Sequence, residues 1–172
     1  MIRQAALDDA EELALLIKQV ESESPYMLYE AGERIISTEK QYEMIKALSK
    51  SDNSTILITM KDEQLVGYLF AVGGNAKKNR HCAYIVIGIL KKYRGSGTGT
   101  LLFEALEEWA SKQRIRRLEL TVMKENLVGV KLYQKSGFDI EGVKRKSLCI
   151  DGRFVDEYYM SKLLEGYDDE SN

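Results

Sequence analysis

The sequence predicts a fold of the α/β class, in which strands and helices alternate along one chain. The runs "STILITM" (54–60) and "LVGYLFAVGG" (65–74) are rich in β-branched and aromatic residues, which is typical of strands. Other segments repeat their apolar residues with the period of an amphipathic helix. With 172 residues, of which 44% are hydrophobic, the chain is long enough for one ordinary core. We expect one domain over residues 1–165 and an acidic tail at 166–172.

The first half of the chain reads as one strand, two helices and a hairpin. A short strand-like stretch at 2–5 precedes a helix that Asp8 or Asp9 can cap. The next segment holds the only proline, Pro25, and interrupts the helical period. A second helix is expected to begin near Thr38, where "TEKQ" resembles a capping box. The two strand runs named above flank the polar "KDEQ" and predict an antiparallel hairpin.

The second half of the chain begins with a strand that is apolar on both faces, which favours a central place in the sheet. The predicted elements are this strand "HCAYIVIGIL" (81–90), the glycine turn "YRGSGTG" (93–99), the helix "TLLFEALEEWA" (100–110), the strand "RRLELTVM" (116–123), the helix "NLVGVKLYQKSG" (126–137), and a hairpin around Asp151 and Gly152. Gly137 is the expected C-terminal cap of the second of these helices.

Composition excludes several classes of function. Lysine and arginine number 25 against 27 aspartates and glutamates, a net charge of −2, so we expect no nucleic-acid partner. The single histidine and two cysteines lack the spacing of metal ligands, so we expect no metal site and reduced thiols. No apolar run approaches the ~18 residues of a membrane span. We therefore expect a cytoplasmic protein without a membrane partner.

The glycine turn at 93–99 is a candidate anion site. A strand that ends in glycines before a helix directs free backbone N–H groups at one point, and the helix dipole favours negative charge there. Gly95, Gly97 and Gly99 permit close approach of an anion such as pyrophosphate, and Arg94 adds positive charge. The alternative is that the glycines only turn the chain. The turn is not a P-loop, because the lysine that a P-loop requires does not follow these glycines. Nor does it match a dinucleotide fingerprint, because Thr100 stands where the third glycine is needed.

A second group of residues lies farther along the chain. Asn126, Val130 and Tyr133 share one face of the predicted helix, over a span of about 10 Å. Together with Arg94, Gly97 and Gly99 after an apolar strand, and with "LYQKSGF" at 132–138, this pattern resembles the GNAT superfamily of acetyl-coenzyme A-dependent N-acetyltransferases. The resemblance covers essentially the whole chain. The C-terminal segment "GFDIEGVKRKSLCIDGRFVDEYYM" (137–160) looks most like the branch that includes ribosomal-protein, small-amine and amino-acid N-acetyltransferases.

The resemblance implies an α/β (α+β) GNAT fold, with a mixed, mostly antiparallel sheet of six to seven strands and about four helices. The sheet would open between its fourth and fifth strands and hold acetyl-coenzyme A there. The residues that the resemblance assigns to the pyrophosphate are Arg94, Gly95, Gly97, Thr98, Gly99 and Thr100, and those assigned to the pantetheine arm are Ile89, Leu90 and Lys91. Asn126 would contact the cofactor, and Tyr133 would lie near its sulfur. Read without the resemblance, Asn126 is only a helix cap and Tyr133 only a half-buried aromatic residue.

Amide formation from a thioester requires a neutral amine, a donor to the developing oxyanion and a proton for the leaving thiolate. We assign the proton to Tyr133 as general acid and the oxyanion to a backbone N–H near Ile89. Relatives that acetylate ribosomal proteins carry a glutamate where this sequence has Thr121. Glu119 lies on the same strand face and is the candidate base, acting through water. The alternative is that no side chain acts as base, which favours an amine of low pKa.

The expected reaction is transfer of an acetyl group to a primary amine of an amino acid, a small amine or polyamine, or a protein N-terminus. Two other readings stay open, namely a non-catalytic acyl-coenzyme A sensor and a nucleotide-binding regulatory domain. Two interpretations are open for the acidic residues expected after the first helix and in the terminal hairpin: they attract a cationic acceptor, or they form a solvated surface. These residues are Glu21, Glu23, Glu30, Glu33, Asp156 and Glu157. Analogy with relatives suggests a homodimer.

Overall fold

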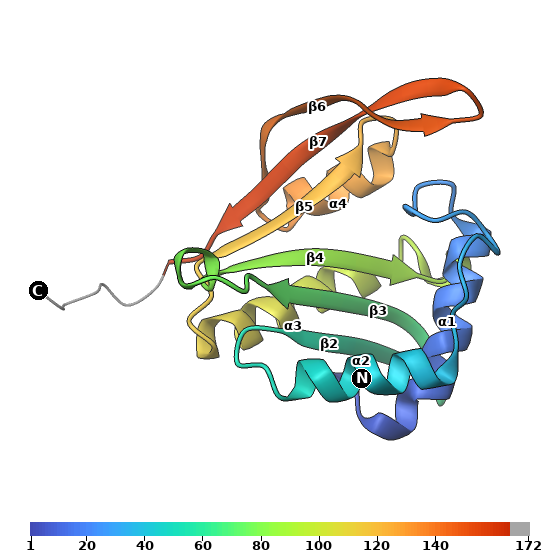
Figure 1. Ribbon diagram of the computed structural model, residues 1–172, viewed down its shortest axis with the longest axis vertical. Coiled ribbons are helices and arrows are strands. Elements are labelled where there is room, and N and C mark those ends of the chain that lie inside the picture. The colour runs from blue at the N-terminus through green and yellow to red at the C-terminus, as the bar shows by residue number, and fades with distance from the viewer. Residues whose placement is uncertain (166–172) are drawn as a thin grey trace, which may run out of the picture.

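The computed structural model of the chain describes residues 1–165 (Figure 1), and the predicted acidic tail at 166–172 lies outside the described residues. Within this range, seven strands form one sheet and α-helices cover both of its faces. The elements are β1 (Ile2–Gln4), α1 (Ala10–Glu23), α2 (Thr38–Ser49), β2 (Thr55–Lys61), β3 (Gln64–Gly73), β4 (Cys82–Ile89), α3 (Thr98–Lys112), β5 (Arg117–Met123), α4 (Leu127–Lys135), β6 (Asp139–Ile150) and β7 (Arg153–Leu163).

The sheet is mixed and mostly antiparallel, as predicted. Its strands follow the order β1-β2-β3-β4-β5-β7-β6, and only β4 and β5 run parallel. The strand that is apolar on both faces, β4, is the middle strand of the seven. A parallel pair needs a crossover connection, and α3 supplies it on one face of the sheet. The crossover begins with the glycine turn, so the turn lies at the carboxyl end of β4.

The two parallel strands separate after three residues. Residues 82–84 of β4 pair with residues 117–119 of β5, whereas β4 pairs with β3 along its length as far as Ile89. Figure 1 shows β4 and β5 close together at one end and far apart at the other. The second half of β4 therefore presents an unpaired backbone edge on the side of β5. This separation is the opening that the resemblance implied between the fourth and fifth strands.

Each face of the sheet has its own hydrophobic core. On one face, α1 and α2 cover β2 and β3, with Leu13 and Ile58 fully buried. On the other face, α3 and α4 cover β4 and β5, with Leu106, Leu118 and Phe138 at its centre. Alternate residues of β4 contribute to this second core, as expected for a central strand.

Local signals in the sequence set most of the boundaries. The helix expected near Thr38 begins at that residue, but the cap is its neighbour Ser37, whose Oγ accepts the Lys40 N–H at 3.2 Å. Gly137 follows α4 with φ +90°, as expected of a C-terminal glycine. The hairpin of β6 and β7 turns at Asp151 and Gly152, which both have positive φ.

Candidate active site

The glycine turn leaves open space above its backbone. Gly95 and Gly97 have φ of +72° and +85°, a region that favours glycine, and a Cβ added at either would meet no atom within 4 Å. Gly97 is the N-cap residue of α3. Within residues 1–165, no acceptor takes the backbone N–H groups of Gly95, Ser96 or Gly97. Free N–H groups at a helix N-terminus are suited to a phosphate or pyrophosphate.

Side chains fix the conformation of this turn. Ser96 Oγ donates to the Tyr93 carbonyl at 2.7 Å and lies 3.0 Å from the Thr98 hydroxyl. Gly99 lies beneath α4, and a Cβ there would come within 2.8 Å of Leu132. Hence Gly99 is needed for close packing of α3 against α4, whereas Gly95 and Gly97 are needed for the shape of the turn. Thr100 follows in the first turn of α3.

The unpaired edge of β4 offers backbone groups in alternation. Leu90 N–H donates to the Val66 carbonyl at 3.0 Å, so Leu90 and every second residue before it bond to β3. The intervening residues, Ile87 and Ile89, direct their N–H and C=O groups toward the opening. Lys91 N–H donates to Glu23 Oε2 at 2.6 Å. Of the three residues predicted to pair with a pantetheine arm, only Ile89 therefore has its backbone directed at the opening.

Two charged residues organise the end of β4. Glu23, the last residue of α1, has its pKa lowered first by the hydrogen bond from Lys91 N–H and then by that from Gln19, with a smaller contribution from Arg94. Arg94 Nε donates to the Ile89 carbonyl at 2.9 Å. Arg94 is thus held against the strand that it follows, beside the turn. The anchoring role of Glu23 was not predicted, because no local pattern connects the end of a helix with a backbone N–H 68 residues away.

Asn126 and Tyr133 both belong to α4 or its cap. Asn126 is the N-cap residue of α4, and its Oδ1 accepts the Gly129 N–H at 3.0 Å. The interpretation of Asn126 as a helix cap is therefore correct. Its Nδ2 takes no part in the cap. The Tyr133 ring is half-buried and packs edge-on against Phe103, with centroids 5.8 Å apart. Burial raises the pKa of Tyr133 to about 12, with a smaller contribution from Tyr84. Its hydroxyl has no hydrogen-bond partner among residues 1–165.

A pair of hydroxyl groups closes the point where β4 and β5 separate. Tyr84 of β4 and Thr121 of β5 lie with Oη and Oγ1 2.8 Å apart. Glu119 is the register partner of Tyr84, and its Oε2 accepts the Arg117 Nε at 2.7 Å. Arg117 is also bound by both carboxylate oxygens of Glu141. Sequence reasoning missed Tyr84, because its pairing with Thr121 depends on the parallel register and not on any local motif.

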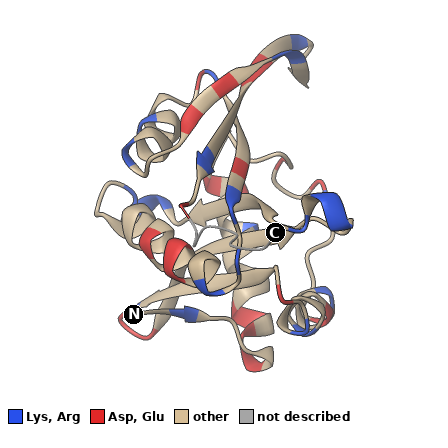
Figure 2. Cartoon of the chain, turned by 90° about the vertical axis from the view of Figure 1, so that its left-hand side faces the viewer, with Lys and Arg blue, Asp and Glu red and all other residues tan. Residues whose placement is uncertain are grey.

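Two of the acidic residues expected after the first helix, Glu21 and Glu23, lie in the last turn of α1 and have structural partners. Glu21 is buried and pairs with Arg34, which also stacks on the Tyr29 ring at 4.2 Å from its centroid. Glu23 binds Lys91 N–H, as described above. Of the two alternatives for these acids, an acceptor site or a solvated surface, neither describes these contacts: Glu21 holds the loop after α1 through Arg34, and Glu23 holds the end of β4. Figure 2 shows acidic and basic positions interspersed along the elements in view.

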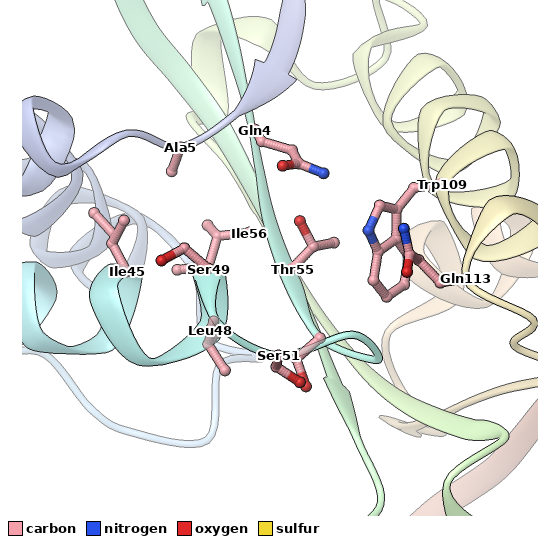
Figure 3. A pocket seen from close by; sticks show the side chains of 11 residues that line it. Gln4, Ala5, Ile45, Leu48, Ser49, Ser51, Thr55, Ile56, Trp109 and Gln113 are labelled. Atoms are coloured by element: carbon pink, nitrogen blue, oxygen red, sulfur yellow. The ribbon is translucent and has the colours of Figure 1, made fainter.

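A second hollow lies away from these residues. It has a volume of about 180 Å³, and its lining includes Thr55 and Ile56 of β2, Trp109 of α3 and Gln113, the C-cap of that helix. Figure 3 shows Trp109 and Gln113 on one side of β2 and Ile45 of α2 on the other. β2 is separated from β5 by two strands of the sheet. The hollow is therefore distinct from the opening between β4 and β5.

Comparison with known proteins decides the family. The family model described as "Acetyltransferase (GNAT) family" matches residues 16–138, which include the turn, the opening and α4. The chain belongs to the acetyltransferase (GNAT) family. This GNAT protein is 32% identical over 108 residues to the L-amino acid N-acetyltransferase AaaT of Escherichia coli (strain K12), a match that covers 62% of this chain and 67% of AaaT.

Solved GNAT structures share the fold. The acetyltransferase of the GNAT family from Streptococcus pneumoniae superposes with a TM-score of 0.91 at 32% identity, over 96% of this chain and 99% of that one. The phosphinothricin acetyltransferase (Pat) from Sinorhizobium meliloti, solved in complex with acetyl-coenzyme A, gives a TM-score of 0.85 at 17% identity, over 100% and 91%. The predicted family, fold and acetyltransferase activity are thereby confirmed, and acetyl-coenzyme A as co-substrate agrees with them.

Two further findings concern residues 1–165 alone. None of the helices there is long and apolar enough to cross a membrane. No group of three or more histidine, cysteine, aspartate or glutamate side chains in the same range is placed to hold a metal ion.

Proposed function

We propose that this GNAT protein transfers an acetyl group from acetyl-coenzyme A to the nitrogen of a primary amine. The observation that supports it most directly is the continuity of the unpaired β4 edge with the glycine turn. Backbone groups of Ile87 and Ile89 lead toward free N–H groups at the start of α3. This arrangement suits a long ligand with a pantetheine-like amide arm and a pyrophosphate at one end.

The residues present fit acetyl-coenzyme A. The proposed contacts are the turn residues Arg94, Gly95, Gly97, Thr98, Gly99 and Thr100, the β4 backbone at Ile87 and Ile89, and the Asn126 side chain. Leu90 and Lys91 shape the end of the strand, since their N–H groups have acceptors in the protein. When bound, acetyl-coenzyme A supplies an acetyl group as a thioester.

Tyr133 is the proposed general acid. A phenol whose pKa is raised to about 12 keeps its proton throughout the physiological pH range. Its hydroxyl projects from a ring fixed by Phe103 and Phe138, so the proton is held at a defined place. The oxyanion donor is proposed to be a backbone N–H of β4 near Ile89.

The acceptor is proposed to be an amine with a substantial neutral fraction near pH 7. Glu119 has one carboxylate oxygen bound to Arg117, so its predicted role as base depends on the other oxygen and on water. An α-amine with a pKa near 8 is partly neutral at pH 7, whereas a lysine-like amine with a pKa near 10.4 is almost fully charged. The similarity to an L-amino acid N-acetyltransferase supports an amino-acid acceptor. Small amines and protein N-termini are the alternatives.

Three other expectations stay predictions. They are a single domain over residues 1–165, a homodimer, and a cytoplasmic location. Analytical ultracentrifugation and limited proteolysis test the first two directly.

Thermal unfolding with acetyl-coenzyme A tests the cofactor, with NAD and ATP as controls. Saturation at about 100 times Kd stabilises the native state by about 2.7 kcal/mol, which raises the Tm by roughly 5–10 °C for a chain of this size. Thiol release is then measured with L-alanine, spermidine and a peptide that begins with alanine. Absence of a shift at millimolar acetyl-coenzyme A contradicts cofactor binding. Binding without release of thiol for any of the three amines contradicts transfer to a primary amine.

A further inference from the structure

Tyr84 stands at the point where the sheet opens. It is the last residue of β4 that pairs with β5, and its phenol reaches across to Thr121 on the neighbouring strand. Ala83 and Ile85 are buried in the core beneath α3, so strand alternation places Tyr84 on the opposite face of the sheet. That face is not covered here, because the Tyr84 side chain is 41% exposed. A ligand that approaches from this face meets the phenol directly.

The Tyr84 hydroxyl lies between apolar side chains on one side and the Glu119 carboxylate, its register partner on β5, on the other. Its cross-strand partner Val72 and its strand neighbour Val86 are exposed on the same face, and Tyr159 lies opposite Thr121. The Tyr84–Thr121 pair is therefore an uncharged hydrogen-bonding point between apolar side chains and the Glu119 carboxylate, which binds Arg117. Such a point orients one polar group of a ligand, while the surrounding side chains contact its carbon atoms.

The Tyr84–Thr121 hydroxyl pair leaves at least one lone pair of the Tyr84 oxygen free to accept a hydrogen bond. A phenol oxygen offers one donor and two lone pairs. If Tyr84 donates to Thr121, both lone pairs of Tyr84 are available, and if Thr121 donates, one is available. In either arrangement, the oxygen accepts an N–H from outside the protein. Thr121 fixes the direction of the phenol in both cases.

The two tyrosines lie on opposite sides of the same opening. Tyr84 projects from the uncovered face of β4, and Tyr133 projects from α4 on the covered face. Tyr84 also contributes, after burial, to the raised pKa of Tyr133. A group held by Tyr84 therefore approaches the opening from the side opposite to the proposed proton donor.

We propose that Tyr84 Oη accepts a hydrogen bond from the N–H of the acceptor amine, with Thr121 as the residue that positions the phenol. This inference rests on the proposed acetyl transfer and names the contact that orients the acceptor. The hydrogen bond leaves the nitrogen lone pair directed toward the opening between β4 and β5. Tyr84 takes no proton in this role, so its contribution is to binding and orientation.

Steady-state kinetics of Tyr84→Phe test this contact, using whichever of L-alanine, spermidine or the alanine peptide the unmodified protein acetylates fastest. The ring is kept and only the oxygen is lost. We expect the KM for the amine to rise about tenfold, while the KM for acetyl-coenzyme A is unchanged. Calorimetric binding of the same amine in the presence of coenzyme A should weaken by the same factor. An unchanged amine KM in Tyr84→Phe overturns the inference.

Thr121→Val and a double variant separate positioning from a merely structural effect. Thr121→Val should raise the amine KM about threefold, and it should add nothing in the Tyr84→Phe background, because both changes remove one interaction. Tyr42→Phe is the matched control, since Tyr42 is 39% exposed and lies on α2, away from the opening. If the effects of Thr121→Val and Tyr84→Phe on the amine KM are fully additive in the double variant, Thr121 does not position the Tyr84 phenol. If the unmodified protein binds acetyl-coenzyme A but acetylates none of the three amines, the proposed function fails and this contact fails with it.

Discussion

The two ends of β4 are both largely apolar but have different neighbours in the sheet. Residues 82–84 are paired on both edges, with β3 on one side and β5 on the other. Among the described residues, 85–89 pair with no strand other than β3, and on their other edge the Ile89 carbonyl accepts Arg94 Nε. The paired end joins two halves of the sheet, whereas the unpaired end leads to the glycine turn and to the candidate active site. Backbone groups that the sheet does not use are thus the ones that remain for a ligand.

The side chains around the two ends follow the same division. At the paired end, Arg117 binds Glu119 on its own strand and Glu141 of β6, which lies beyond β7 in the sheet. At the unpaired end, Gly88 has no side chain, and the Tyr68 ring lies directly against it. The first arrangement adds one ion pair between strands, and the second brings a large ring close to the strand backbone. Substitutions at the two ends should therefore affect stability and activity differently.

The largest expected effect is that of Tyr133→Phe at the unpaired end. Loss of the proton donor should lower kcat by about 100-fold or more, as is typical of general acids. The rise in Tm with acetyl-coenzyme A should persist, because the ring and its packing are kept. Stopped-flow or thiol-release kinetics measure the first quantity, and thermal unfolding measures the second. A kcat within twofold of the unmodified value would remove Tyr133 from the mechanism.

The next largest effect is expected from Gly88→Ala, and it is a loss of stability. An added Cβ would lie 2.4 Å from the Tyr68 Cζ, within a buried and rigid contact. Overpacking of this kind destabilises by about 1–3 kcal/mol. Gly142→Ala on β6 is the control, because a Cβ there meets no atom within 4 Å. Urea unfolding compares the two variants, and equal stability of both would contradict the importance of the contact between Tyr68 and Gly88.

Gly97→Ala tests the turn that follows the unpaired end. Positive φ is unfavourable for alanine by roughly 1–2 kcal/mol, and the added methyl group enters the open space above the turn. We expect the Kd of acetyl-coenzyme A to rise about tenfold. Gly152→Ala provides a matched change, since Gly152 has φ +78° and lies in the distant β6–β7 turn. That variant should lose similar stability and bind acetyl-coenzyme A normally, and equal weakening in both variants would argue against the turn as the binding site.

The smallest expected effect is on the pH dependence of thermal stability, and it concerns an ion pair at the paired end of β4. Arg117 and then Ser161 lower the pKa of Glu141 to about 2, below the value of about 4.3 in an unfolded chain. A lowered pKa adds stability above pH ~4.3, and this contribution is lost as the pH falls toward 2. Glu141→Gln should therefore have a slightly lower Tm than the unmodified protein near neutral pH, with the difference vanishing near pH 2. Differential scanning calorimetry across this range measures it, and a difference that is independent of pH would contradict the ion pair as its cause.

Much of this molecule was determined by the sequence alone. Some features depend on only a few neighbouring residues, namely the strand and helix periods, the Asp151–Gly152 turn and the glycines after β4. They can therefore be recognised in the sequence itself. The same is true of Asn126 and Tyr133, whose shared helix face follows from their spacing. The cap of α2 was misplaced by one residue, because Ser37 and Thr38 are both good capping residues and only the backbone conformation distinguishes them.

The tertiary structure decided which of these groups face one another. The bond from Lys91 N–H to Glu23 and the contact between Tyr84 and Thr121 join residues 68 and 37 positions apart. They depend on the parallel register of β4 and β5 and on the packing of α1 against the sheet, which no local pattern specifies. The separation of β4 from β5 after three pairs is likewise a property of the assembled sheet. Hydrophobic periodicity determines which face of a strand is buried, but where two neighbouring strands stop pairing is set by the layers that pack on either side of them.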